Sequence, residues 1–480
     1  MATRVERGTV SIDACFLWAW LAILAWAPIP LGSNRPWAWS VLEGAVFALA
    51  ALWAACYALG KVTPTEPLKK SGWFLSLLGL WLAYQGVFVL PLPRELVIFL
   101  SPEAAAMHAM VDADARAGAW ITLSVDQHAS TVSWFKSLLN ASSFVMTLAV
   151  ISSRRRAEQF AYVLVVVALV LSVYGLMLHL TDFKQVWFKT FIQHGLQASA
   201  TFANRNHFAG FLEMTLAIGI GLLIAGLRDA PPQTWKQFLK QVLEWIFSPK
   251  MRLRLMLCVM VIALVSTHSR MGNAAFFASM TIAGVVGLAL SRHATRSTVI
   301  LLVSLIIIDV SIVGSWFGLE KLAQRIEQTT ILQTADKTKD SLENREEPSK
   351  YGIDLIKDYP LTGSGPGSWY VVFPRYRGAD IVNFFEYAHN DYVQFVAESG
   401  IVGATLLVAI VLWSLAVALI AQYRRRDPLM RGLSFASIMG VTSILIHSSV
   451  DFNLQIPSNA MYFMVLLAFG WIALHLDRHA

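Results

Sequence analysis

Charged residues are scarce in this sequence. Asp, Glu, Lys and Arg make up 14% of its 480 residues, whereas hydrophobic residues make up 56%. Soluble globular domains carry about 25% charged residues. The shortage of charge therefore argues against a soluble protein and indicates one that crosses a membrane several times.

Cysteine is also scarce. Cys15, Cys56 and Cys258 all fall within apolar runs and lack metal-ligand spacing, so we expect them to pack as small hydrophobic residues and read no disulfide framework. No HExxH motif, metal-binding aspartate pair or carboxylate pair at glycosidase spacing stands out. We therefore predict that any catalysis proceeds without a metal ion or cofactor.

Long apolar runs dominate the chain. A helix needs about 20 apolar residues to cross the hydrocarbon core of a bilayer. We therefore predict an all-α polytopic membrane protein, with 1–480 as a single integral membrane domain, about twelve spans and a first span that is retained as an anchor. The predicted spans are 12–31, 38–59, 71–90, 132–152, 158–179, 207–227, 252–267, 273–291, 297–316, 401–421, 432–450 and 457–476.

Basic residues gather in alternate loops, most clearly in Arg154-Arg155-Arg156 and in 228–254. By the positive-inside rule these loops are cytoplasmic, which places both termini inside. The opposite face then carries a smaller loop over 91–131 and a large periplasmic loop over 317–400, between spans nine and ten. The formal net charge of +7 is explained by this topology and by attraction to anionic membrane lipids, so we predict no nucleic-acid partner.

The two outer loops are expected to contain short helices. Residues 102–117 alternate apolar and acidic side chains, which predicts a helix on the outer surface. Residues 351–357 predict a second helix that ends before Pro360.

Polar side chains converge on the outer ends of the predicted spans. Burying an acidic side chain in a membrane costs free energy, so such residues are functional candidates by default. For Glu213, Asp309 and Asp451, however, we expect a structural role in holding arginines in place. The active face is therefore expected to be the outer one. The converging residues are Glu43, Glu213, Asp309, Arg205, Arg270, His268, His389, His447 and Asp451.

The segment 360–403 is polar, rich in glycine and aromatic residues, and flanked by apolar runs. Its His389 is the best candidate for proton transfer, because imidazole titrates near neutral pH; a structural loop histidine is the alternative. The turn over 363–367 could offer backbone N–H groups to an anion, and a plain turn is the alternative. It is not a P-loop, because no Gly-Lys-Ser/Thr follows.

Arg205 and Arg270 each lie at the outer end of a predicted span. Guanidinium groups match phosphate oxygens in bidentate pairs, and a diphosphate needs more than one cation. The alternative is that these arginines extend to lipid headgroups.

Several segments together resemble one family. PLTGSGPGSW…AHNDYVQFVAESGIVG in 360–403, TFANRNHFAGFLEM at 201–214, the Ser269-Arg270 turn and HSSVDFNLQIPSNAMYF at 447–463 are similar, in order and spacing, to the O-antigen ligase and O-antigen polymerase superfamily. The resemblance covers roughly 200–480, and PIPLGSNRPWAW near the start is similar to the N-terminal region of some members.

The resemblance implies a C-type glycosyltransferase of the bacterial inner membrane that is metal-independent and inverting. The implied donor is an undecaprenyl-diphosphate-linked glycan on the periplasmic side. The implied acceptor is the lipid A core, a carrier-linked repeat unit or a protein hydroxyl. His389 would be the general base, and Arg270, with Arg205 and Arg345, would bind the diphosphate. Possible supporting residues are Arg375, Arg377, Asn390, Asp391, Glu213 and Asp451.

Other classes of protein remain open at this point. Twelve spans with both ends inside also suit a secondary transporter, but transporters usually bind substrate near the middle of the bilayer. A scaffold subunit of an envelope polysaccharide machine is a further alternative. Ligase, polymerase and protein O-oligosaccharyltransferase share the motifs read here, so the sequence does not separate them.

Overall fold

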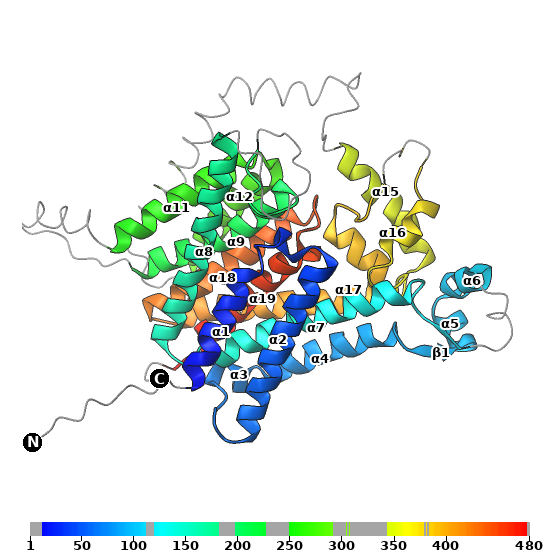
Figure 1. The fold of residues 1–480 in the computed structure, drawn as a ribbon, viewed down its shortest axis with the longest axis horizontal. Coiled ribbons are helices and arrows are strands. Elements are labelled where there is room, and N and C mark those ends of the chain that lie inside the picture. The colour runs from blue at the N-terminus through cyan, green and yellow to red at the C-terminus, as the bar shows by residue number, and fades with distance from the viewer. Residues whose placement is uncertain are drawn as a thin grey trace, which may run out of the picture.

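The computed structural model describes residues 12–111, 120–181, 197–226, 249–290, 304, 307, 343–378, 381 and 384–477, without side chains at 249–250 and 343–347. These residues are mainly helical (Figure 1). The helices are α1 Ile12–Trp26, α2 Pro36–Ala58, α3 Glu66–Lys70, α4 Gly72–Val87, α5 Arg94–Leu100, α6 Pro102–Val111, α7 Gln127–Val150, α8 Arg154–Leu180, α9 Arg205–Ala225, α11 Pro249–Ser266, α12 Arg270–Ala289, α15 Glu343–Asp358, α16 Trp369–Val372, α17 Asp391–Arg424, α18 Pro428–His447 and α19 Pro457–His475.

Seven of the described helices are long and apolar enough to cross a membrane, namely α2, α8, α9, α12, α17, α18 and α19. Each apolar run predicted from the sequence coincides with a described helix, except 297–316, which lies almost wholly outside the described residues. The all-α class is therefore confirmed, while the number of twelve spans and their orientation stay predictions.

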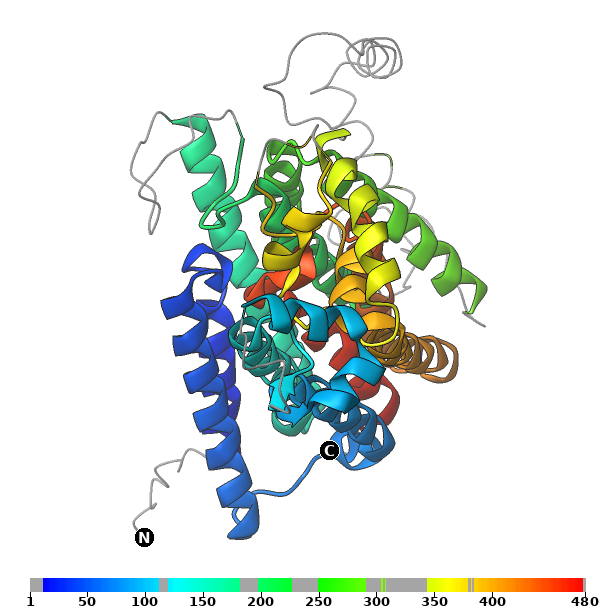
Figure 2. The same ribbon diagram turned by 90° about the vertical axis from the view of Figure 1, so that its right-hand side faces the viewer.

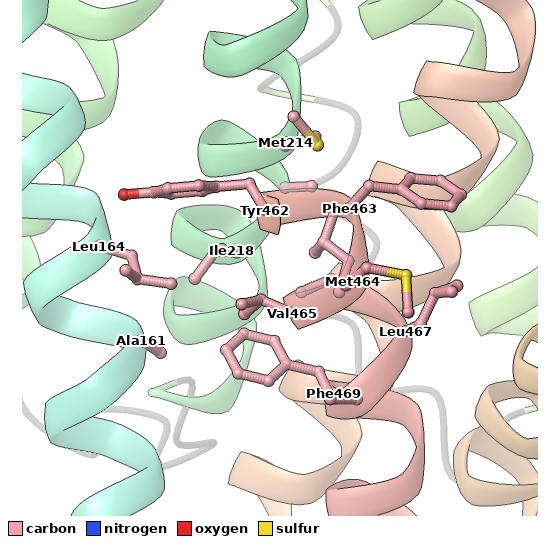
Figure 3. Close-up of a cluster of buried hydrophobic side chains, with 14 of the residues drawn as sticks. Ala161, Leu164, Met214, Ile218, Tyr462, Phe463, Met464, Val465, Leu467 and Phe469 are labelled. Carbon is pink, nitrogen blue, oxygen red and sulfur yellow. The ribbon is translucent and has the colours of Figure 1, made fainter. Parts of the chain in front are cut away.

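Helices α9, α18 and α19 form the centre of the bundle. Most residues of these three helices are buried, and Figure 3 shows Tyr462 and Phe469 of α19 among side chains of α8 and α9. Helices α9 and α18 cross at Gly221 and Gly432, where a Cβ on either residue would lie within 2.3 Å of the other's carbonyl oxygen. Small residues permit this close approach. The hairpin of α1 and α2 lies at one side of the bundle (Figure 2).

Hydrogen bonds connect segments that are distant in the sequence. A first set joins segments expected outside and a second set joins segments expected inside, while the orientation itself stays a prediction. The bonds join Thr201 to Pro28, Ala198 to Ser266 and Asp391 to Ser448 in the first set, and Arg154 to Asp427 and Thr65 to Leu148 in the second.

A second hydrophobic core lies beyond the spans, at the end where the predicted outer loops meet. Buried side chains of α5, α6, α15 and α16 form it. The smaller loop also contains an antiparallel pair of short strands, β1 Pro91–Pro93 and β2 Trp120–Thr122, with Pro91 opposite Thr122. The helix predicted over 102–117 is present as α6, as far as the structure describes this segment. The helix predicted over 351–357 is part of the longer α15.

Candidate functional site

His389 lies in the turn just before α17, and its backbone has an unusual conformation. Its φ is +50°, in the left-handed region that side chains other than glycine rarely adopt. The preceding peptide is held on both sides: the Ala388 N–H donates to Oε1 of Gln394 at 3.0 Å, and the Ala388 carbonyl accepts from Oγ of Ser349 at 2.9 Å. Helices α15 and α17 therefore fix the position of His389.

Asn390 and Asp391 attach the start of α17 to the loop that follows α18. Oδ1 of Asn390 caps the helix, while its Nδ2 donates to the carbonyl of Ser449 at 2.8 Å. Oδ2 of Asp391 accepts from Oγ of Ser448 at 2.7 Å and from the N–H of Leu454 at 3.1 Å. These contacts hold the start of α17, directly after His389, against the loop that follows α18.

The glycine-rich turn at 363–367 binds a carboxylate of the protein itself. Glu398 is buried in α17, and it accepts hydrogen bonds from the N–H groups of Gly367 at 2.9 Å and Trp369 at 3.2 Å, and from Nε2 of Gln394 at 3.2 Å. These two N–H groups are thus occupied, which favours the plain turn over a site for an external anion. Glu398 was not predicted as a site residue from the sequence, although an acid next to a long apolar run was an available signal.

We expect Glu398→Ala to destabilise the protein by about 2–5 kcal/mol, because two buried backbone N–H groups would lose their acceptor. The apparent melting temperature of the detergent-purified protein, followed by intrinsic fluorescence, measures this effect. Glu66→Ala is the matched control, because Glu66 belongs to an exposed ion pair with Lys69, and such pairs contribute little. Equal melting temperatures for the two variants would contradict the structural role given to Glu398.

The ring of Phe452 connects His389 with the first turn of α9. Its centroid lies 4.8 Å from that of His389 and 4.5 Å from that of His207, both in edge-to-face arrangements. On another side it stacks on Tyr387, with centroids 4.4 Å apart and an interplanar angle of 17°. Phe452 is itself buried, so it is a fixed aromatic spacer among these rings.

Two helix N-termini adjoin next to this aromatic cluster. Arg205 is the first residue of α9 and Arg270 is the first residue of α12. The helices touch near their starts, since a Cβ on Gly272 would lie 2.7 Å from Cβ of Ala209. Helix N-termini attract anions through their free N–H groups and dipoles. The structure therefore places the starts of the two helices that carry these arginines side by side, with Arg270 exposed and Arg205 partly exposed.

Buried carboxylates behind the arginines pair with histidines. Glu213 accepts from Oγ of Ser443 at 2.6 Å and lies 2.7 Å from Nδ1 of His447. Oδ1 of Asp451 lies 3.4 Å from Nε2 of His207. Our expectation that Glu213 holds an arginine was therefore wrong, because α9 packs this carboxylate against α18.

The three predicted arginines of the large loop lie in different surroundings. Nη1 of Arg375 lies 3.6 Å from Oε2 of Glu103 in α6, so Arg375 links the large loop to the smaller one. Arg377 is exposed; its backbone N–H donates to the carbonyl of Phe373 at 3.1 Å. Position 345 lies four residues before Ser349 in α15, and so on the same helix face.

Two of the candidate side chains cannot be placed. The side chain of Arg345 and the whole of Asp309 lie outside the described residues.

Comparison with known proteins supports the resemblance seen in the sequence. Residues 255–408 match a family model described as O-antigen ligase. The matched region includes Arg270, the glycine-rich turn and His389. No curated protein matches the chain.

Proposed function

We propose that this protein moves glycan from an undecaprenyl-diphosphate donor to an acceptor hydroxyl. The proposal rests on the match of residues 255–408 to the O-antigen ligase family, which supports the O-antigen ligase and polymerase superfamily. Members of this family are glycosyltransferase-like enzymes that act on lipid-linked glycans. The apolar helices and the family fit a multi-pass bacterial membrane protein. In our proposal this membrane is the inner one and the reaction takes place on its periplasmic face.

One observation carries the proposal: Arg205 and Arg270 begin two helices that touch, and the aromatic cluster links this point to His389. The leaving group of the reaction is a lipid diphosphate, whose negative charge grows as the glycosidic bond breaks. Fixed guanidinium groups and helix N-termini stabilise such charge in the transition state. They supply positive charge where other transferases use a metal ion, so we propose a metal-independent reaction.

In this reaction His389 is the general base that takes the proton of the acceptor hydroxyl. The acceptor oxygen attacks the anomeric carbon, the bond from that carbon to the phosphate oxygen breaks, and the hydroxyl proton passes to the imidazole. A single displacement of this kind inverts the anomeric centre. A base must be held within reach of the proton that it takes, and the hydrogen bonds to Ala388 provide that positioning.

The envelope glycans of a strain that lacks the gene, compared with the strain complemented by the wild type, test the proposal. Carrier-linked long chains that do not reach lipid A core would identify a ligase. Collapse to single repeat units, or loss of a secreted polymer, would identify a polymerase. A glycan profile that is unchanged by the deletion would overturn the proposed function and favour a transporter.

A further inference from the structure

A second cluster of charged side chains lies between α2, α7 and the segment before His389. At its centre Nζ of Lys136 in α7 lies 4.1 Å above the ring of Trp39 in α2. Lys136 also interacts electrostatically with Glu43, Glu386 and Glu398. The cluster thus combines one ammonium group, one tryptophan face and three carboxylates from four separate parts of the chain.

Helix geometry explains why these groups meet. Ser133 lies directly under the glycine-rich turn, since a Cβ on Gly367 would lie 2.6 Å from its Oγ. Lys136 follows three residues later on the same face of α7, beneath the carboxylate that this turn binds. Trp39 and Glu43 are four residues apart on α2 and share the face that meets α7.

Glu43 and Lys136 do not pair with each other in this cluster, whereas the glycine-rich turn satisfies Glu398. Oε1 of Glu43 is buried and accepts no hydrogen bond from the described residues. Within the same described part of the chain, Lys136 forms no ion pair, and its ammonium group contacts the tryptophan ring. Buried polar groups are normally paired, and charged side chains within spans usually mark functional positions. The cluster therefore offers acceptors and donors to a polar ligand.

Exposed aromatic and acidic side chains form the outer rim of the cluster. Tyr370 is 39% exposed. The hydroxyl of Tyr370 donates to Oδ2 of Asp126 at 3.0 Å, and Glu386 lies near enough to act electrostatically on Tyr370. An exposed surface of aromatic faces and carboxylates suits a ligand with both C–H faces and hydroxyl groups.

Tyr387 connects the cluster to the reaction centre. It interacts electrostatically with Arg35 and hydrogen bonds to Glu386. Burial, and then the nearby carboxylates, raise the pKa of Tyr387, so the phenol stays protonated and can donate. Its ring stacks on Phe452, which contacts His389. The ring of Phe452 thus contacts His389, Tyr387 at the edge of this cluster, and His207 in the first turn of α9.

We propose that Trp39, Glu43, Lys136 and Glu386 of this cluster, together with Tyr370 at its rim, bind a sugar of the acceptor glycan and present its hydroxyl to His389. This inference rests on the proposed function. Carboxylates accept hydrogen bonds from sugar hydroxyls, Lys136 donates to sugar oxygens, and exposed aromatic faces pack against apolar faces of the ring. Three carboxylates around one lysine disfavour a phosphate or a uronic acid. The preferred ligand is therefore a neutral sugar.

Saturation-transfer NMR on the full-length protein in lipid nanodiscs tests the inference, with glucose, N-acetylglucosamine and glucuronate as probes. We expect the wild type to give signals with a neutral sugar that exceed those with glucuronate. Glu386→Gln and Lys136→Met should each weaken the neutral-sugar signal by about tenfold, the effect of losing a hydrogen bond to a charged group. The distant Glu66→Gln should retain it.

Three results would overturn the sugar site: no signal from either neutral sugar with the wild type, a stronger signal from glucuronate, or unchanged signals in Glu386→Gln. Glu386 is exposed, so its substitution reports on binding even if Lys136→Met does not fold. Because the measurement needs no turnover, failure here is separate from failure of the proposed function, which the glycan profile reports.

Discussion

Replacement of His389 by alanine is expected to slow glycan transfer by about 10²- to 10⁴-fold, the usual contribution of a general base. The structure supports a large effect because the peptide before His389 is held by hydrogen bonds from two helices. Donor binding should change little, since His389 is separated from the first turn of α9 by the ring of Phe452. Transfer by the purified protein from its extracted lipid-linked glycan, measured beside donor binding, checks both parts.

Two further histidine variants separate a chemical role from a structural one. His389→Gln retains a hydrogen-bonding side chain but cannot take a proton, so it should be nearly as slow as His389→Ala if the imidazole is the base. Recovery of most activity in His389→Gln would instead show that the residue only orients the acceptor. His128→Ala, at an exposed position in the first turn of α7, should match the wild type. A His389→Ala rate within about threefold of the wild type would refute the catalytic assignment.

The helices could be predicted because their cause is local. In a membrane, the backbone N–H and C=O groups of an apolar run of about 20 residues need hydrogen-bond partners, and only a helix supplies these within one segment. The start of α17 was not predicted, because the span was expected over 401–421 whereas the helix begins at Asp391; the favourable N-cap residue Asn390 was the available signal. The convergence of polar side chains on the outer ends of the spans stays a prediction; Asp391 and Ser448, both expected there, form a hydrogen bond.

The partners of the charged residues could not be predicted, because they depend on how distant helices pack. Glu398 binds N–H groups of a turn about thirty residues earlier in the chain, and its own neighbours in the sequence do not indicate this. Glu213 was expected to hold an arginine, but the crossing of α9 and α18 brings His447 to it. Lys136 was not noticed at all, because a single lysine in an apolar run has no sequence pattern that shows what it faces.

The second large effect concerns the diphosphate. Arg270→Ala is expected to weaken binding of undecaprenyl diphosphate by about 10- to 100-fold, since a charge-assisted hydrogen bond to phosphate is lost. Arg270→Lys should recover part of the affinity, because lysine keeps the charge but not the bidentate geometry. Equilibrium binding of undecaprenyl diphosphate and undecaprenyl monophosphate by the full-length protein measures both. We expect Arg270→Ala to lose most of the preference for the diphosphate.

Two controls test this prediction, a variant of a distant arginine and the addition of a chelator. Arg252→Ala removes an exposed arginine at the opposite end of α11 from Arg270, and it should leave diphosphate affinity unchanged. A chelator should also leave the affinity unchanged if arginines alone neutralise the phosphates. Equal losses of affinity for the diphosphate and the monophosphate in Arg270→Ala would contradict a specific diphosphate contact.

The adjoining starts of α9 and α12 lead to a prediction about both arginines together. If Arg205 and Arg270 bind the same diphosphate, their effects on its affinity should be coupled, and the double substitution should cost less than the two single losses combined. If Arg205 instead extends to lipid headgroups, its substitution should leave diphosphate affinity unaltered and the effects should simply add. The contact of Gly272 with Ala209 holds the two helix ends together, so Gly272→Val should separate them and reduce affinity even with both arginines present. A Gly272→Val protein that folds and binds diphosphate as the wild type does would show that the paired helix ends are not the binding site.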